Sequence, residues 1–286
     1  MADGSVYMFT VALVSMGTAS LLYWLHAIGK RAIAVRYTIV GPALAIVGNG
    51  GTGRYATLTL TIGFVTLTLS LILRWIASGH PPYSNQYEFA TAFAWGTTLA
   101  YLYFERKYKQ RSLGVFVVPV AAGFLIYAST LPSTIEPLIP ALQNDLLLSF
   151  HVASAIFSYG LFTVAFGAAV MYLMQREDHF AWLPSRETLD DIGYRAVALG
   201  LPAQALLLVL GMVWAHTAWG RYWGWDPKET AALVTFLVYA GYMHAHSLRG
   251  WRGTRSALVL LVGFGAVLFT FFGNYFLGGL HTYGGV

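Results

Sequence analysis

Cysteine is absent from this sequence, and charged residues are scarce. Without cysteine the chain has no disulfide, no thiolate metal site, no thiol redox relay and no thioether link to a prosthetic group, so any metal must be bound by His, Met or carboxylate side chains. Charged residues make up 10% of the 286 positions, compared with about a quarter in an ordinary soluble domain, while apolar residues reach 57%. This composition excludes an ordinary soluble domain and indicates an integral membrane protein.

Uncharged runs recur along the chain, and most of them reach the ~20 residues that a helix needs to cross the hydrocarbon of a bilayer. A helix satisfies its backbone hydrogen bonds internally, which an isolated strand in lipid does not. We therefore predict one all-α domain over residues 1–286, a polytopic membrane bundle of about eight transmembrane helices. The predicted spans are Ser5–Gly29, Tyr55–Leu73, Phe89–Phe104, Ser112–Ile135, Leu146–Gln175, Ala196–Gly220, Thr230–Leu248 and Ser256–Val286. A shorter glycine-rich run, Tyr37–Gly53, is predicted to be interfacial or re-entrant.

Arginine and lysine are distributed unevenly between the predicted loops. Cytoplasmic loops collect these residues, and eight spans with both termini on the outer (periplasmic or lumenal) face put nearly all of them on the inner side. Only Arg221 and Lys228 remain outside, with Arg74 near a helix end. Anionic membrane lipid accounts for the net charge of +5, and no basic stripe interleaved with aromatics supports a nucleic-acid partner. The first apolar run precedes its basic cluster, which is the reverse of a signal peptide and predicts a retained first helix.

The eight histidines fall into layers under this topology. A single histidine at a helix end is most often an interfacial residue with a hydrogen bond, although ionisable groups at membrane depth mark functional sites more often than in soluble proteins. His244 and His246 lie two positions apart, about 200° around a helix, so at most one of them is a buried ligand. The outer layer holds His80, His151, His216 and His281, the inner layer holds His26, His244 and His246, and His179 lies in an inner loop.

Tryptophan is concentrated between the sixth and seventh predicted spans, where residues 214–229 hold four of the nine tryptophans. An interfacial aromatic belt needs only one or two such residues per helix end. Aromatic faces with Gly220 and Gly224 between them suit a flat apolar surface for a planar ligand. Asp226 and Pro227 then predict the start of the next helix, because Asp caps and Pro tolerates the first helical position. The aromatic members are Trp214, Trp219, Tyr222, Trp223 and Trp225.

The string from Trp219 to Glu229, WGRYWGWDPKE, resembles the WWD signature of the haem-handling superfamily that includes CcsA (ResC), CcmC, CcmF and NrfE. Other segments are similar to the CcsA branch in particular, and the resemblance covers nearly the whole chain. Those segments are SGHPPYSNQYE at 78–88, His151 at the head of the fifth span, Tyr242-Met243-His244 in the seventh span, and LHTYG at 280–284.

The resemblance implies cytochrome c biogenesis: a protein that binds haem b non-covalently, moves or presents it at the outer face, and holds it for an apocytochrome c bearing CxxCH. In this family two outer histidines flanking the WWD segment bind the haem iron, which here map to His151 and His281. The aromatic members above and Asp226 would complete the haem site. An inner haem site maps to His244, with its counterpart expected from the membrane partner CcsB (ResB), which leaves His26 unassigned. Arg221 or Lys228 would meet the haem propionates.

The resemblance also implies that the chain is a component of a cytochrome c haem lyase (synthase) complex and not itself the nucleophile. A thiol-reducing pathway would act indirectly, by keeping the apocytochrome cysteines reduced. The expected location is the bacterial inner (cytoplasmic) membrane, with the thylakoid membrane as the alternative. Asp226 and Glu229 would serve proton transfer in a further reading, but helix capping already accounts for both.

Three other functions compete with this one. A bis-His membrane cytochrome in electron transfer would also use layered histidines, but it gives no reason for the tryptophan-rich loop. A secondary transporter would show carboxylates near the centres of its spans, which this sequence lacks. A CcmC-like exporter that hands haem to a separate chaperone would be distinguished by the absence of a CcsB partner.

Overall fold

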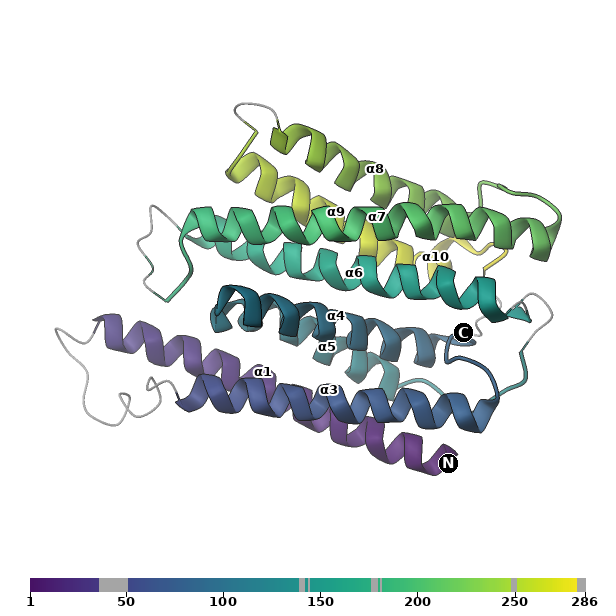
Figure 1. Cartoon of the computed structure of the whole chain (residues 1–286), viewed down its shortest axis with the longest axis horizontal. Helices are drawn as coiled ribbons and strands as arrows, with labels where there is room; N and C mark the ends of the chain where they lie inside the picture. Colours follow the sequence, from purple (N-terminus) through teal and green to yellow (C-terminus); the bar gives the residue numbers. More distant parts are fainter. Residues whose placement is uncertain are drawn as a thin grey trace.

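The chain folds into a helix bundle, and the described residues contain no strand (Figure 1). The structure is a computed structural model that describes residues 1–35, 51–138, 142, 143, 145–175, 180, 182–247 and 251–281. Eight long helices lie in these ranges, which confirms the predicted all-α fold. They are α1 (Ala2–Val35), α3 (Gly51–Ser78), α4 (Gln86–Tyr108), α5 (Gly114–Ser129), α6 (Asp145–Met174), α7 (Arg186–Trp219), α8 (Pro227–Ser247) and α9 (Thr254–Phe272), with the short η1 (Arg111–Leu113) and α10 (Asn274–Leu277).

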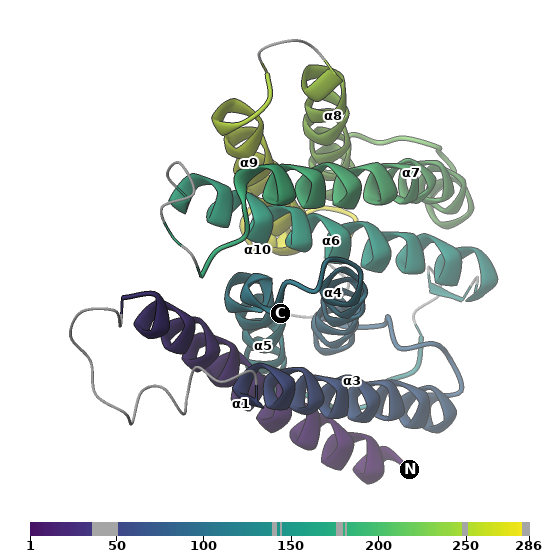
Figure 2. The ribbon, with the colours of Figure 1, turned by 60° about the vertical axis from the view of Figure 1, so that its left-hand side comes forward.

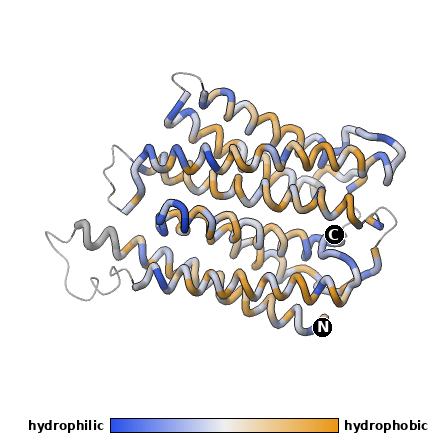
Figure 3. The backbone as a smooth tube through the Cα atoms, in the orientation of Figure 1, coloured by the Kyte–Doolittle hydropathy of each residue, from blue (hydrophilic) through white to orange (hydrophobic). Residues whose placement is uncertain are grey.

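Six of these helices are long and apolar enough to cross a membrane: α1, α3, α5 together with η1, α6, α7 and α9. The remaining long helices, α4 and α8, are not among these six, and each carries four charged or imidazole groups, mostly near its ends. Figure 3 shows hydrophobic residues along the middle of the bundle and hydrophilic residues toward the helix ends and connections. The distribution is that of a protein whose main solvent is lipid.

Two helices depart furthest from the uncharged runs of the sequence, and both differences have the same cause. α7 begins at Arg186, well before Ala196, where the uncharged run begins. Its first turns contain charged residues, so they lie outside that run. The last predicted span, Ser256–Val286, exceeds the helix, since α9 ends at Phe272. Absence of charge indicates lipid exposure and does not indicate where a helix starts or stops. In the run Tyr37–Gly53, all residues before α3 lie outside the described residues.

The helices pack in successive layers. α4 and α5 lie in the middle, with the α1–α3 pair on one side and α6 with α7 on the other, and α8 and α9 lie beyond (Figures 1 and 2). The crossing of α4 and α6 depends on two glycines, because a Cβ added to Gly160 would lie 2.5 Å from the carbonyl oxygen of Gly96. Small residues at helix contacts are the usual means of close packing within a membrane.

The alternating helices define two ends of the bundle. The site end holds the α3–α4, α5–α6 and α7–α8 connections and the segment after α9; the basic end holds the other connections (Figure 1). The described arginines and lysines at the site end are Arg74, Arg221 and Lys228. Those toward the basic end are Arg54, Arg106, Lys107, Lys109, Arg111, Arg186, Arg195, Arg252 and Arg255. This asymmetry agrees with the predicted orientation, in which the basic end is cytoplasmic.

Reporter fusions test the orientation directly. Fusions after Lys107 and Arg252 should report the cytoplasm, and a fusion at residue 286 should report the outer face, because the positive-inside rule places the basic end in the cytoplasm. A cytoplasmic signal from residue 286 would mean that the number of crossings is odd and the predicted span count is wrong.

A buried ion pair at the site end explains part of the motif at 78–88. Arg74 Nε lies 2.6 Å from Glu88 Oε1, and the two side chains are 2% and 0% exposed. Arg74 also donates to the backbone carbonyls of Ser133 (2.8 Å) and Thr134 (3.0 Å). The backbone N–H and the hydroxyl of Ser84 both donate to the other oxygen of Glu88, at 2.6 and 2.7 Å. The pair therefore joins α3, the α3–α4 loop, α4 and the segment after α5.

Candidate functional site

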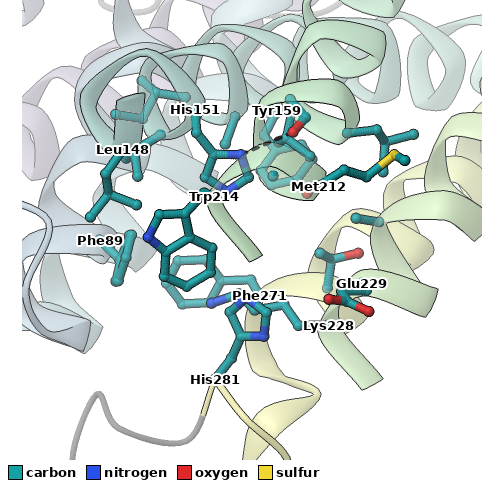
Figure 4. Close-up of a pocket in the computed structure, with 18 of the residues that line it drawn as sticks. Phe89, Leu148, His151, Tyr159, Met212, Trp214, Lys228, Glu229, Phe271 and His281 are labelled. Carbon is teal, nitrogen blue, oxygen red and sulfur yellow. Dashed lines mark hydrogen bonds between the residues drawn. The ribbon is translucent and has the colours of Figure 1, made fainter. Parts of the chain in front are cut away.

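A cavity lies at the site end, between α4, α6, α7, α8, α9 and the segment after α9 (Figure 4). His151 and His281, the two predicted outer ligands, both line it. Its mostly apolar, aromatic lining suits the apolar face of an organic ligand. The aromatic residues in the lining are Phe89, Phe93, Tyr159, Trp214, Trp223 and Phe271.

His151 lies near the start of α6 and reaches toward the backbone of α7. Its Nδ1 lies 2.9 Å from the carbonyl oxygen of Leu207. Gly211 follows Leu207 by one helical turn on the same face of α7, and a Cβ there would lie 2.8 Å from Cε1 of His151. The missing side chain at Gly211 therefore makes room for the imidazole. Sequence reasoning did not find Gly211, whose only signal is a glycine inside an apolar helix.

His281 lies after α10 and is held by the loop between α7 and α8. Its Nδ1 lies 2.8 Å from Oδ2 of Asp226, and its ring centroid lies 5.5 Å from that of Trp214 and 4.9 Å from that of Trp219. Burial lowers the pKa of the His281 imidazole, and the hydrogen bond to Asp226 only partly offsets this. The imidazole is therefore neutral at pH 7.

Asp226 is ionised beside this neutral imidazole. Burial raises the pKa of its carboxyl. The hydrogen bond from His281, the charge that His281 carries in acid, and the backbone N–H groups of Lys228 and Leu280 outweigh burial and lower the pKa to about 2. These interactions stabilise the folded protein fully at any pH above the ordinary carboxyl pKa. Their contribution is lost as the pH falls through about 2, where Asp226 becomes protonated. The pair therefore persists across the physiological pH range.

The predicted aromatic platform is only partly gathered at the cavity. Trp214 and Trp223 line it, and Trp219 packs edge-to-face on Trp214 with ring centroids 4.7 Å apart. Tyr222 and Trp225 are 55% and 70% exposed and are not part of the lining. The structure thus brings three of the five predicted aromatic residues to the site or into contact with it.

The start of α8 has the predicted geometry. The helix begins at Pro227, and Asp226 Oδ2 accepts the N–H of Lys228 at 3.0 Å. Glu229 reaches back into the loop, where its Oε2 accepts the N–H groups of Gly224 (2.9 Å) and Asp226 (3.2 Å). Trp225 has a φ of 54°, a left-handed conformation that is uncommon for a tryptophan. Glu229 thus folds the loop onto the first turn of α8.

Lys228 is the cationic residue in the cavity lining. Its Nζ lies 5.1 Å from the ring centroid of Phe89, and among the described residues no carboxylate lies at ion-pair distance from it. Arg221 is exposed and is not part of the lining. The structure therefore separates the two cations that the sequence left as alternatives.

The inner histidines lie apart from one another. His244 is exposed on α8, whereas His246 is buried, with its Nε2 2.9 Å from Oδ2 of Asp190. His26 is buried on α1 beside Gly53 of α3. α1 packs on α3 and α5 while α8 packs on α7 and α9, at opposite sides of the bundle (Figures 1 and 2). His26 and His244 are therefore not brought together within this chain.

The remaining histidines lie outside the cavity or outside the described residues. His216 stacks on Tyr222, with ring centroids 4.3 Å apart. His80 is buried, with Nδ1 3.0 Å from the carbonyl oxygen of Pro81 and no hydrogen-bond partner for Nε2 among the described groups. His179 lies outside the described residues. In the part of the chain that the structure describes, no three His, Asp or Glu residues group as a metal cluster.

Comparison with known proteins gives consistent matches. Residues 83–281 match the family described as cytochrome C assembly protein, a range that includes both cavity histidines and the whole loop between α7 and α8. The cytochrome c biogenesis protein CcsA of Prochlorococcus marinus strain MIT 9313 is 34% identical, over 97% of this chain and 98% of the relative. CcsA of the red alga Pyropia yezoensis is 33% identical, over 85% of this chain and 91% of the relative.

A solved structure has the same fold. The cytochrome c heme lyase CcmF superimposes with a TM-score of 0.66 at 19% identity, over 99% of this chain. The match covers 48% of CcmF, so the chain spans about half the length of that protein. The likeness supports the helical architecture, and the sequence relatives support the branch that the motifs indicated. On the match over residues 83–281 and the extent of similarity to CcsA proteins, the chain belongs to the cytochrome c assembly protein family.

Proposed function

We propose that this protein acts in cytochrome c biogenesis by binding haem b non-covalently in the cavity at the site end and presenting it to apocytochrome c. The observation that carries the proposal is that one aromatic cavity is lined by two imidazoles whose Nδ1 atoms each face an oxygen acceptor. The backbone oxygen of Leu207 and the ionised carboxylate of Asp226 can only accept, so Nδ1 of each histidine carries the proton. Nε2 of each neutral ring then carries the lone pair that binds iron.

The residues in the cavity lining have the chemistry that the rest of a haem molecule requires. Aromatic side chains and aliphatic residues cover a porphyrin and exclude water, while the propionates require a cation. Lys228 supports this part of the proposal, because its ammonium lies in the lining without a carboxylate partner among the described residues. We assign the propionate role to Lys228 in preference to the exposed Arg221.

The protein's own contribution is positioning. Haem supplies the vinyl groups to which the apocytochrome thiols add, and this chain, which has no cysteine, holds the haem in one orientation for that reaction. His151 and His281 are the residues that would hold the iron of bound haem. The cavity lies at the end of the bundle that the charge asymmetry predicts to be the outer face, where apocytochrome c arrives.

The inner site of this proposal requires a second chain. His244 is exposed on α8 on the same face as Val234 and Leu237, so its imidazole would lie against lipid in an isolated chain. A polar group in that position is costly unless a partner covers it. We propose that CcsB covers this face and supplies the second ligand to haem bound at His244.

Purification with and without CcsB tests the proposal. The chain purified with CcsB should carry haem with the spectrum of a low-spin, six-coordinate iron, because two neutral imidazoles fill both axial positions. Acidified organic solvent should extract all of it, since no thioether to this chain is possible. Haem stain that remains on the separated polypeptide, or purified protein without any haem, would contradict the proposal.

A further inference from the structure

Asp226 is the point at which two distant parts of the chain meet. Its side chain is 5% exposed and accepts three hydrogen bonds. Oδ2 accepts the N–H of Lys228 at 3.0 Å, which caps α8. Oδ2 also accepts from Nδ1 of His281 at 2.8 Å, and Oδ1 accepts the N–H of Leu280 at 2.6 Å. Helix capping explains only the first of these bonds. The other two hold the segment that carries His281.

The backbone before His281 is shaped to fit around this carboxylate. Gly278 and Gly279 have φ values of 63° and 134°, which residues other than glycine rarely adopt. A Cβ on Gly279 would lie 2.5 Å from Oδ1 of Asp226 and 3.0 Å from Cδ of Pro227. The segment therefore approaches Asp226 as closely as a backbone can, and a side chain at Gly279 would separate them.

The two cavity histidines are oriented by different kinds of group. His151 donates to a backbone carbonyl in a long helix, which no side-chain substitution removes. His281 donates to a carboxylate, a negatively charged acceptor that strengthens the bond and increases the electron density on the ring.

We propose that Asp226 is the positioning residue for His281: its carboxylate keeps the proton on Nδ1 and so presents Nε2 of this ring to the haem iron. This inference rests on the proposed function, and it adds a role for the Asp of the tryptophan-rich loop that is distinct from contact with the ligand. In Asp226→Asn an amide NH₂ group replaces one of the two accepting oxygens, so a donor faces a donor in either orientation of the amide. With the NH₂ group toward His281 nothing accepts the Nδ1 proton, and with the amide oxygen toward His281 the acceptor is uncharged and weaker.

The experiment compares the haem spectrum and haem affinity of the full chain, purified with CcsB, across three variants. Asp226→Asn, Asp226→Ser and His281→Gly should each convert low-spin, six-coordinate haem to a high-spin, five-coordinate species. The Asp226 variants should lower haem affinity by roughly 10–100-fold, the usual effect of removing a carboxylate that orients a metal-bound histidine. Serine retains a side-chain acceptor for the helix cap but is too short to reach His281, so Asp226→Ser separates loss of positioning from loss of α8.

Asp190→Asn is the matched control, because Asp190 accepts from His246 at 2.9 Å at the opposite end of the bundle. It makes the same chemical change in another Asp–His pair and should leave the outer haem six-coordinate. If His281→Gly loses the sixth ligand while Asp226→Asn and Asp226→Ser both keep it, the positioning role of Asp226 is wrong and the ligand assignment stands. If His281→Gly itself keeps a six-coordinate spectrum, the ligand assignment within the proposed function fails.

Discussion

His151→Gly and His281→Gly should each abolish cytochrome c assembly while leaving the protein in the membrane at its normal level. Each imidazole lines the cavity and makes a hydrogen bond through Nδ1, whose loss is small beside the packing of the long helices. Under the proposed function the decisive loss is a ligand to the haem iron. Millimolar-range external imidazole should partly restore assembly, because a free imidazole enters the vacated space and fills the axial position. Holo-cytochrome c, measured by haem stain and normalised to the amount of membrane protein, is the readout.

His216→Ala is the control for this experiment. His216 also lies at the site end, but it stacks on the exposed Tyr222 and is not part of the cavity lining, so assembly should proceed normally without it. Normal assembly in both glycine variants without imidazole would show that the ligand pair is wrong. The next candidate would then be His80, whose buried Nε2 has no hydrogen-bond partner among the described groups.

Glu88→Ala should destabilise the protein more than any substitution of an exposed charge. Glu88 is fully buried against Arg74, and removing one member of a buried ion pair leaves the other charge desolvated and uncompensated. Such a loss costs roughly 3–5 kcal/mol in free energy of unfolding. Denaturant-induced unfolding of the detergent-solubilised protein, followed by circular dichroism and by loss of bound haem, measures the change.

A double variant distinguishes an unpaired charge from lost packing. Arg74→Leu combined with Glu88→Leu should recover part of the stability lost in Glu88→Ala, since no buried charge remains. Recovery should be incomplete, because the carbonyls of Ser133 and Thr134 also lose their donor. Arg195→Ala, which removes an exposed i,i+4 ion pair with Asp191, should leave the unfolding midpoint nearly unchanged. An unchanged midpoint for Glu88→Ala would mean that the pair is hydrated and not buried.

Helix content and the position of α8 could be predicted from the sequence because both depend on local chemistry. Long uncharged runs predict membrane helices, and Asp226 followed by Pro227 predicts a helix start at the residue where α8 begins. Gly211 could not be predicted as part of the site, because its role depends on where His151 of another helix lies. The last uncharged run extends past the end of α9. Gly278 and Gly279 carry no charge, so by charge alone they cannot be told from residues of a membrane helix, although their positive φ angles are not helical.

In the candidate site, too, features that depend on neighbouring residues could be predicted, and contacts between distant parts of the chain could not. The motif resemblance selected His151 and His281, and the structure brings both to one cavity, although neither residue type nor spacing indicates that they are neighbours. The sequence left Arg221 and Lys228 as equal candidates, because both are cations on the same loop. Only the fold, which brings Lys228 into the cavity lining near Phe89 and leaves Arg221 outside it, separates them. Likewise, the capping role of Asp226 was predictable and its bond to His281 was not.

The order in which the chain is made has a consequence for the cavity. His281 follows α9, whereas Trp214, Trp219 and Asp226, which it contacts, precede α8. A nascent chain that has inserted α6, α7 and α8 therefore holds one cavity imidazole and lacks the other until α9 has crossed the bilayer and the segment 278–281 has folded around Asp226. Under the proposed function, six-coordinate haem would therefore be a chemical sign that membrane insertion has been completed, and partly inserted chains would not compete with finished ones for haem.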